Sequence, residues 1–212
     1  MCGVPSQLIY RKYVKRILDL IGVVILALPA LIIIVVCYVS IKLETKGPAL
    51  FIQERPGYKG KLFRIYKLRT MIVETERDGV ALTDMERMTK IGRVIRVLSI
   101  DELPQIWNIL RGEMSFIGPR PLLPGYLPLY TQEQMRRHDV RPGVSGWAQV
   151  NGRNEISWDQ KFERDICYVD NLCFNLDYKI LYMTIVNVFK RQGINSGISD
   201  TMPIFDKKAV SL

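Results

Sequence analysis

The chain has 212 residues, of which 48% are hydrophobic, and this length suits one domain with an added anchor. Its 30 Lys and Arg residues against 21 Asp and Glu give a formal net charge of +9, which favours anionic partners such as phosphorylated substrates or lipid headgroups. The basic residues are spread along the chain, which argues against a nucleic-acid-binding arm, and one histidine and four scattered cysteines argue against a zinc site or a Ser-His-Asp triad.

The first predicted element is a membrane helix, because residues 20–41 form an unbroken, uncharged apolar stretch. A helix of this length is about 33 Å long, enough to cross a hydrocarbon core of about 30 Å. Basic residues flank both ends, and Pro29 near the middle is expected to kink the helix. Symmetric basic flanks fit a re-entrant helix with both ends on one membrane face, whereas a mildly kinked helix fits a simple crossing. The residues alone leave both topologies open.

A short β-hairpin is predicted after this helix, with strands at residues 49–53 and 62–71. The turn signals between them are Arg-Pro-Gly at 55–57 and Lys-Gly at 59–60. The second strand alternates apolar and polar residues, which indicates one solvent-facing side. Lys67 and Arg69 lie near its end, and a period of two residues predicts that both side chains share one face. There they would meet either solvent or a pyrophosphate.

The remaining elements are mostly helical, so the predicted fold class is α+β with a small, mostly helical globular domain. Helices are expected from residue 84 to about 97, from about 101 to 111, at 131–139, from 158 to about 171 and at 177–191. The last of these is amphipathic and would either lie on the bilayer or cover the core. Asp177 at its start fits an N-cap. The tail after Gly193 has no strong pattern.

Asp101 and Glu102 are adjacent carboxylates at a predicted helix start. Ser99 stands three residues before Glu102, as in a capping box, so a structural role explains the pair. A chemical role is the alternative, because the free N–H groups of a helix start attract phosphate. A carboxylate beside a phosphoanhydride can hold Mg²⁺ or attack phosphorus to form an acyl phosphate.

Arg120 is a second candidate, because Pro119 and Pro121 fix the backbone on either side of it. A guanidinium held in this way can grip two phosphate oxygens. Arg153 borders a Gly-rich connection at residues 141–153, where a ligand can approach the backbone closely. The chain has neither a GxGxxG fingerprint nor a P-loop, so a nucleotide would have to be bound in another way.

Five segments together carry a family resemblance: Arg-Pro-Gly at 55–57, FRIYKLRTM at 63–71, LSIDELPQ at 98–105, MSFIGPRP at 114–121 and RPGVSGWAQVNGR at 141–153. In this order they resemble the small monotopic phosphoglycosyl transferases. These bacterial enzymes move a sugar 1-phosphate from a UDP-sugar to a polyprenol phosphate.

The resemblance implies a re-entrant membrane helix that breaks at its proline, on the cytoplasmic face of the bacterial inner membrane. Several members carry a serine before that proline, where this chain has Leu28. The implied organisation is a membrane-associated segment at 1–46, a catalytic domain with interfacial amphipathic helices at 47–193 and a C-terminal tail at 194–212.

The resemblance also implies a reaction. Asp101 matches a nucleophile that attacks the β-phosphate of the UDP-sugar, releases UMP and forms an aspartyl phosphosugar, which the polyprenol phosphate then attacks. Glu102 matches its partner carboxylate, and both are expected to hold Mg²⁺. The expected substrate-binding residues are Lys67, Arg69, Arg120, Arg153 and Asp177. The expected partners are the UDP-sugar, the polyprenol phosphate and inner-membrane lipids, with no nucleic acid. A non-catalytic basic membrane module and a phosphatase with a carboxylate nucleophile are the alternatives.

Overall fold

A long N-terminal helix runs along one side of the protein in the computed structural model, which describes residues 4–77, 79–152, 156–190 and 205. It begins with α1 (Val4–Ile9), continues through a π-helical turn (Tyr10–Val14) and becomes α2 (Lys15–Glu44). By length and composition, this helix is able to cross a membrane. Most of its large apolar side chains are exposed, as expected of a surface that lipid covers.

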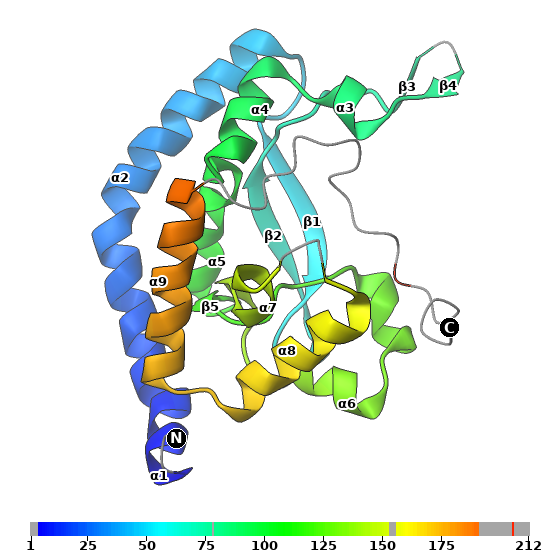
Figure 1. Ribbon diagram of the computed structural model, residues 1–212. Coiled ribbons are helices and arrows are strands. Elements are labelled where there is room, and N and C mark those ends of the chain that lie inside the picture. The colour runs from blue at the N-terminus through cyan, green and yellow to red at the C-terminus, as the bar shows by residue number, and fades with distance from the viewer. Residues whose placement is uncertain (1–3, 78, 153–155, 191–204, 206–212) are drawn as a thin grey trace.

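The predicted break at Pro29 is absent, because α2 continues through this residue without interruption. Figure 1 shows one gradually curved helix rather than two arms. A proline inside a helix removes one backbone hydrogen bond, which a long helix tolerates by bending.

The predicted hairpin is confirmed. Strand β1 (Leu50–Pro56) pairs antiparallel with β2 (Leu62–Leu68), with Leu50 opposite Leu68. A 3₁₀ turn (Tyr58–Gly60) joins them, with Lys59 and Gly60 in the left-handed region. Phe63 and Ile65 of β2 point inward, which is the alternation that the sequence predicted.

The middle of the chain is mainly helical, with short strands between the helices. In chain order it contains β3 (Glu76–Arg77), β4 (Val80–Ala81), α3 (Asp84–Arg87), α4 (Lys90–Val97), the 3₁₀ helix η3 (Ile100–Gln105), α5 (Ile106–Arg111) and β5 (Ser115–Ile117). The helix predicted from residue 84 to 97 is interrupted, because Thr89 caps a new helix by accepting a hydrogen bond from Gly92 N–H.

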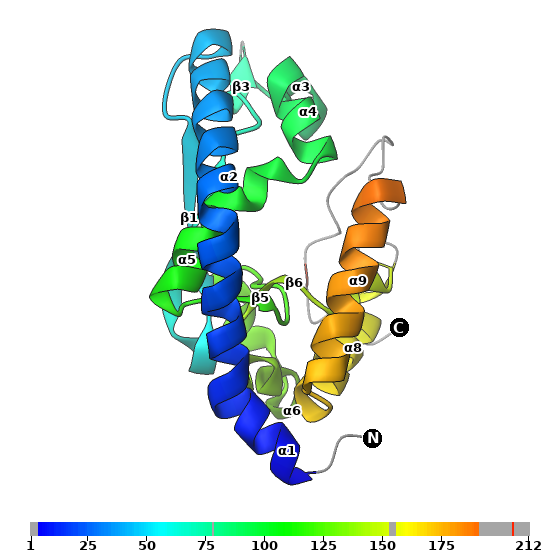
Figure 2. The same cartoon turned by 90° about the vertical axis from the view of Figure 1, so that its left-hand side faces the viewer.

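The last third of the described chain packs beside the first half. It contains the 3₁₀ helix η4 (Pro124–Leu129), α6 (Gln132–Met135), the 3₁₀ helix η5 (Arg136–Asp139), β6 (Gly143–Ser145), α7 (Trp147–Val150), α8 (Trp158–Asp170) and α9 (Phe174–Lys190). Strand β6 runs parallel to β5. Figure 2 shows α8 and α9 on one side of α2 and β1 on the other. The predicted tail lies outside the described residues except for Phe205.

Among the described residues, helix α2 and the π-helical turn before it contribute to three of the four hydrophobic clusters. Tyr10 packs with β5, α8 and α9, Val23 with the hairpin and α5, and Ile41 with the end of β2 and α4. The fourth cluster is aromatic and includes Tyr130, Phe162 and Phe205. One stripe of the membrane helix is therefore part of the core of the globular domain, while the rest of its surface is exposed.

Helix α9 covers the core with one face, which is one of the two roles that its amphipathic pattern allowed. Ile180 is fully buried in the cluster that contains Tyr10, so one face of the helix covers the core. The opposite face exposes large apolar side chains, namely Phe174, Tyr178, Leu181, Tyr182 and Ile185.

Candidate active site

Asp101 and Glu102 lie in the 3₁₀ helix η3, and the capping box suggested by Ser99 does not form. Ser99 has a φ of 54°, in the left-handed region, and its side chain makes no cap hydrogen bond. A serine in this conformation is uncommon and costs free energy. A capping box therefore does not explain why Asp101 and Glu102 stand at this position.

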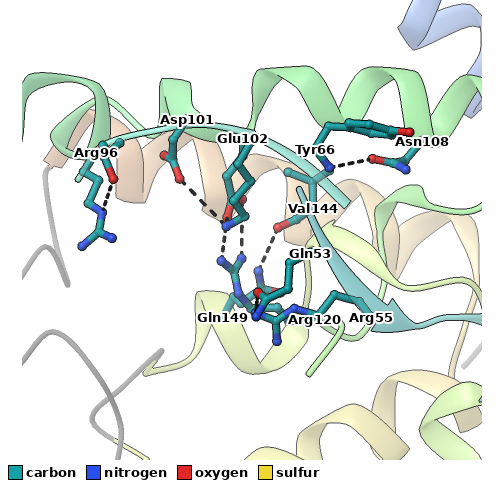
Figure 3. Close-up of polar contacts among 12 residues, drawn as sticks. Gln53, Arg55, Tyr66, Arg96, Asp101, Glu102, Asn108, Arg120, Val144 and Gln149 are labelled. Atoms are coloured by element: carbon teal, nitrogen blue, oxygen red, sulfur yellow. Dashed lines mark hydrogen bonds and ion pairs between the residues drawn. The ribbon is translucent and has the colours of Figure 1, made fainter. Parts of the chain in front are cut away.

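Three elements bring the acidic pair together with two basic residues (Figure 3). Lys67 Nζ, at the end of β2, donates a hydrogen bond to Glu102 Oε1 at 2.7 Å. Arg120 Nη2, from the loop after β5, donates to the same oxygen at 2.6 Å. Lys67 Nζ also lies 3.9 Å from Asp101 Oδ2, too far for a hydrogen bond. Of the five predicted substrate-binding residues, Lys67 and Arg120 are thus brought to the carboxylates.

The two carboxylates differ in their ionisation. Burial raises the pKa of Asp101, and the negative charge of Glu102 raises it further, against the opposing effects of Lys67 and Arg120. Burial also raises the pKa of Glu102, but Arg120 and Lys67 together outweigh this and lower it to about 2. Glu102 is therefore the fixed counterion of the two cations. Compared with Glu102, Asp101 is the more basic carboxylate, and neither Lys67 nor Arg120 makes a hydrogen bond to it.

Main-chain hydrogen bonds hold the loop of Arg120 against β6. Gly118 N–H donates to the carbonyl of Ser145 at 2.8 Å, and Gly143 N–H donates to that of Pro119 at 3.0 Å. Gly118 is required here, because a Cβ would lie 2.4 Å from the Arg141 carbonyl oxygen. The side chain of Arg120 is 44% exposed, so the cluster opens to solvent at this residue.

Asn108, on helix α5, joins the element that carries the acidic pair to the hairpin. It is fully buried, and its Nδ2 donates to the carbonyl of Arg64 at 2.7 Å. This bond ties α5, which continues from η3, to the strand that carries Lys67.

Arg69 is not on the same face as Lys67, because β2 ends at Leu68 and its alternation stops there. The guanidinium of Arg69 turns instead to the end of α2, where Nη2 donates to Thr45 Oγ1 at 2.5 Å. It therefore joins the membrane helix to the hairpin.

Asp177 lies inside α9, three residues after its start, and is not an N-cap. Its buried carboxylate accepts hydrogen bonds from Tyr10 at 2.6 Å, Lys15 at 2.5 Å and Tyr168 at 2.7 Å. These contacts fasten the beginning of the membrane helix to α8 and α9. Arg153, the remaining predicted residue, lies outside the described residues.

Sequence reasoning missed two polar neighbours of Arg120, which Figure 3 places beside it. Arg55 donates to Gln53 Oε1 at 2.6 Å, and burial and the charge of Arg120 both lower its pKa. Gln149 donates to the Val144 carbonyl at 2.8 Å. The sequence pattern indicates only a turn at Arg55, although its Arg-Pro-Gly segment belongs to the ordered motif set.

The acidic pair is a suitable donor set for Mg²⁺. In the described part of the chain, no group of three or more His, Cys, Asp or Glu side chains is placed to hold a metal. Mg²⁺ does not need such a group, since it commonly binds one or two carboxylates together with substrate phosphates and water. Asp101 and Glu102 supply hard oxygen donors of this kind.

Comparison with known proteins gives a consistent family. Residues 10–191 match the model described as bacterial sugar transferase. The "Uncharacterized sugar transferase EpsL" of Bacillus subtilis (strain 168) is 52% identical over 180 residues, which cover 85% of this chain and 89% of that protein.

Two relatives have more specific names. The UDP-N-acetylgalactosamine-undecaprenyl-phosphate N-acetylgalactosaminephosphotransferase of Aeromonas hydrophila is 42% identical over 85% of this chain but only 45% of its own length. The UDP-glucose:undecaprenyl-phosphate glucose-1-phosphate transferase of Caulobacter vibrioides is 38% identical over 81% of this chain and 68% of its own length. The chain belongs to the bacterial sugar transferase family, and the phosphoglycosyl transferase resemblance of its motifs is confirmed.

Proposed function

We propose that this protein transfers a sugar 1-phosphate from a UDP-sugar to undecaprenyl phosphate and releases UMP, through a covalent intermediate on Asp101. The observation that carries the proposal is the unequal acidic pair. Glu102 is locked between Lys67 and Arg120, whereas Asp101 beside it has a raised pKa and an oxygen 3.9 Å from Lys67. The names of the Aeromonas and Caulobacter relatives support the donor and the acceptor.

In the first step, a carboxylate oxygen of Asp101 attacks the β-phosphorus of the UDP-sugar. A bond forms between this oxygen and phosphorus, while the bond from phosphorus to the bridging oxygen breaks and UMP leaves with the electron pair. Lys67 and Arg120 lie where they can offset the negative charge on the phosphoryl oxygens. Mg²⁺, held by Asp101 and Glu102 with the diphosphate, would supply further charge neutralisation.

In the second step, a phosphate oxygen of the lipid acceptor attacks the phosphorus of the aspartyl phosphosugar. The bond between phosphorus and the Asp101 oxygen breaks, which restores the carboxylate and gives the lipid diphosphate sugar. Glu102 stays ionised through both steps, because its ion pairs with Arg120 and Lys67 outweigh burial and lower its pKa to about 2.

We further propose that both ends of the membrane helix lie on the cytoplasmic face of the inner membrane. The same globular domain holds both ends: Arg16 donates to the Ile109 carbonyl at 2.6 Å, and Glu44 accepts from Lys90 N–H at 2.8 Å. A helix that crossed the bilayer would separate these ends. The exposed apolar face of α9 would lie at the same membrane surface, within reach of the lipid acceptor.

Labelling of single cysteines tests this topology. Leu8 and Lys46 are both exposed, one near each end of the helix. In a background without the native cysteines, an impermeant reagent applied from the cytoplasmic side should label both Leu8→Cys and Lys46→Cys. Labelling of the two positions from opposite faces would contradict the proposed topology.

Trapping the intermediate tests the reaction. The wild-type enzyme, incubated with a UDP-sugar but no lipid and quenched in acid, should gain the mass of one phosphosugar. Asp101→Asn should gain none and should lose UMP release, while the exposed control Asp84→Asn should behave as wild type. Turnover by Asp101→Asn, or a fully active wild type that never carries the adduct, would refute the covalent mechanism.

A further inference from the structure

We propose that Arg137 is a positioning residue that holds Arg120 in place for the donor diphosphate. The inference rests on the proposed function, because it assumes that Arg120 contacts phosphate. Arg137 Nη2 donates to the backbone carbonyl of Arg120 at 2.7 Å. This bond reaches the main chain of a residue whose own guanidinium pairs with Glu102.

Arg137 itself is firmly fixed. Its Nε and Nη2 donate to Asp165 Oδ2 at 3.1 and 2.7 Å, and the two side chains are 1% and 2% exposed. Its guanidinium also lies 5.9 Å from the ring centroid of Tyr130 and 5.8 Å from that of Phe162. The planar fork thus spans from Asp165 on α8 to the loop of Arg120.

The stability of the fold does not by itself explain this buried ion pair. Removing two charges from water costs about as much as their attraction returns, and apolar residues of similar volume often replace such pairs without loss. A well-packed aromatic cluster already surrounds Arg137, with Tyr130 and Phe162 among its members. An apolar residue could not reproduce two hydrogen bonds, a long one of 3.4 Å to the Tyr130 hydroxyl within the same cluster and the 2.7 Å bond to the carbonyl of Arg120. Only the second reaches the candidate active site.

That carbonyl is a particularly effective point of attachment. The peptide group between Arg120 and Pro121 has no N–H, so its oxygen is the one hydrogen-bonding atom it offers. The neighbouring bonds to Gly143 and Ser145 hold the loop only up to Pro119. Arg137 therefore fixes the last peptide group before the chain leaves the site.

A small displacement of Arg120 is expected to affect binding strongly. Its side chain is partly exposed, so packing alone does not set its position. Misplacing a charged group by about 1 Å costs on the order of a hundredfold in an enzyme reaction. We therefore expect Arg137→Lys to lower kcat/KM by about tenfold or more, mainly through a higher KM for the UDP-sugar.

A double-mutant cycle tests the link, with UMP release as the readout. In Arg137 the single nitrogen Nη2 donates to both Asp165 Oδ2 and the Arg120 carbonyl, and Nε donates to Asp165 as well. The side chain that Arg137→Lys introduces ends one bond short of Nη2 and lacks the Nε donor, so its ammonium cannot make the same set of bonds. If Arg137 acts through Arg120, Arg137→Lys should cost little more in an Arg120→Ala background. Equal losses in both backgrounds would overturn the inference. The adjacent Arg136→Lys is the matched control, since Arg136 pairs with Glu133 and Asp170 at the surface.

Hydrogen–deuterium exchange of the full chain in nanodiscs gives a readout that needs no activity. Arg137→Lys should speed amide exchange at residues 118–123 and leave α5 unchanged, whereas Arg136→Lys should change neither. Asp165→Asn should give the same local effect, and it provides the test if Arg137→Lys does not fold. Unchanged exchange at 118–123 would overturn the inference. If the wild type released no UMP from any UDP-sugar, the proposed function would fail, and the exchange result would still decide whether Arg137 holds the loop.

Discussion

Replacing Asp177 by asparagine should destabilise the protein strongly and selectively, because this carboxylate fastens the membrane helix to the globular domain. It faces Lys15 at 2.5 Å, and the side chains of Lys15 and Asp177 are 11% and 9% exposed. The introduced amide has one acceptor oxygen, so it would accept a hydrogen bond from only one of the Tyr10 and Tyr168 hydroxyl groups and present its NH2 group to the other. It would also carry no charge. Lys15 would then be a buried ammonium that has lost its ion-pair partner, and the charge of Asp19, beyond ion-pair distance, would offset only part of this loss.

The magnitude follows from this uncompensated charge. Removing one partner of a buried ion pair costs about 3–5 kcal/mol. For a chain of this size, about 1 kcal/mol corresponds to about 2–4 °C in Tm, so Asp177→Asn should lower Tm by about 10 °C. Adding Lys15→Met removes the buried charge, and the double variant should recover at least half of the loss.

Thermal unfolding in detergent micelles, at one scan rate, measures the effect. Asp139→Asn is the matched control, because Asp139 pairs with Lys59 at a similar 2.6 Å but on the surface. Its unfolding free energy should change by less than about 1 kcal/mol. A double variant as unstable as Asp177→Asn alone would refute the explanation by a buried charge.

Three further results are expected. In Glu102→Gln, loss of the neighbouring negative charge should lower the pKa of Asp101. Because protonation of Asp101 abolishes its attack, the residual kcat/KM should fall off at a lower pH than in wild type. A fall at the same or a higher pH would contradict this explanation. Gly92→Ala should lower unfolding free energy by about 1–3 kcal/mol in chemical denaturation, despite the better helix propensity of Ala, because its Cβ would lie 2.0 Å from the Thr70 carbonyl oxygen. Phe205→Ala should destabilise the fold by about 3 kcal/mol and lower Tm, because it removes a ring that is 2% exposed and packs in the aromatic cluster. An unchanged Tm would show that the ring is not held there.

Local patterns predicted the parts of the fold that depend on nearby residues. The hairpin follows from alternation and turn signals at 55–60, and α8 follows from the capping box that opens it at Ser157. The proximity of Lys67, Arg120 and the acidic pair was not evident from spacing. It followed from the family resemblance, and the structure brings these four residues together.

The errors share a physical cause, which is that distant contacts override local preference. Arg69 continues the alternation of β2 in sequence, but the strand ends before it and Thr45 binds it. The partners of Asp177 at positions 10 and 15 are more than 160 residues away in sequence. No local pattern could have indicated such contacts.

In the proposed topology one helix is shared between the bilayer and the protein interior, which links biogenesis to folding. Because Tyr10, Val23 and Ile41 complete three separate hydrophobic clusters, residues 47–212 produced alone would expose apolar surface at each of these places. During synthesis the helix leaves the ribosome before residues 47–212, and these later segments would fold against it. Insertion into lipid and maturation of the catalytic unit would then be a single event, and a soluble truncated enzyme is not expected to exist.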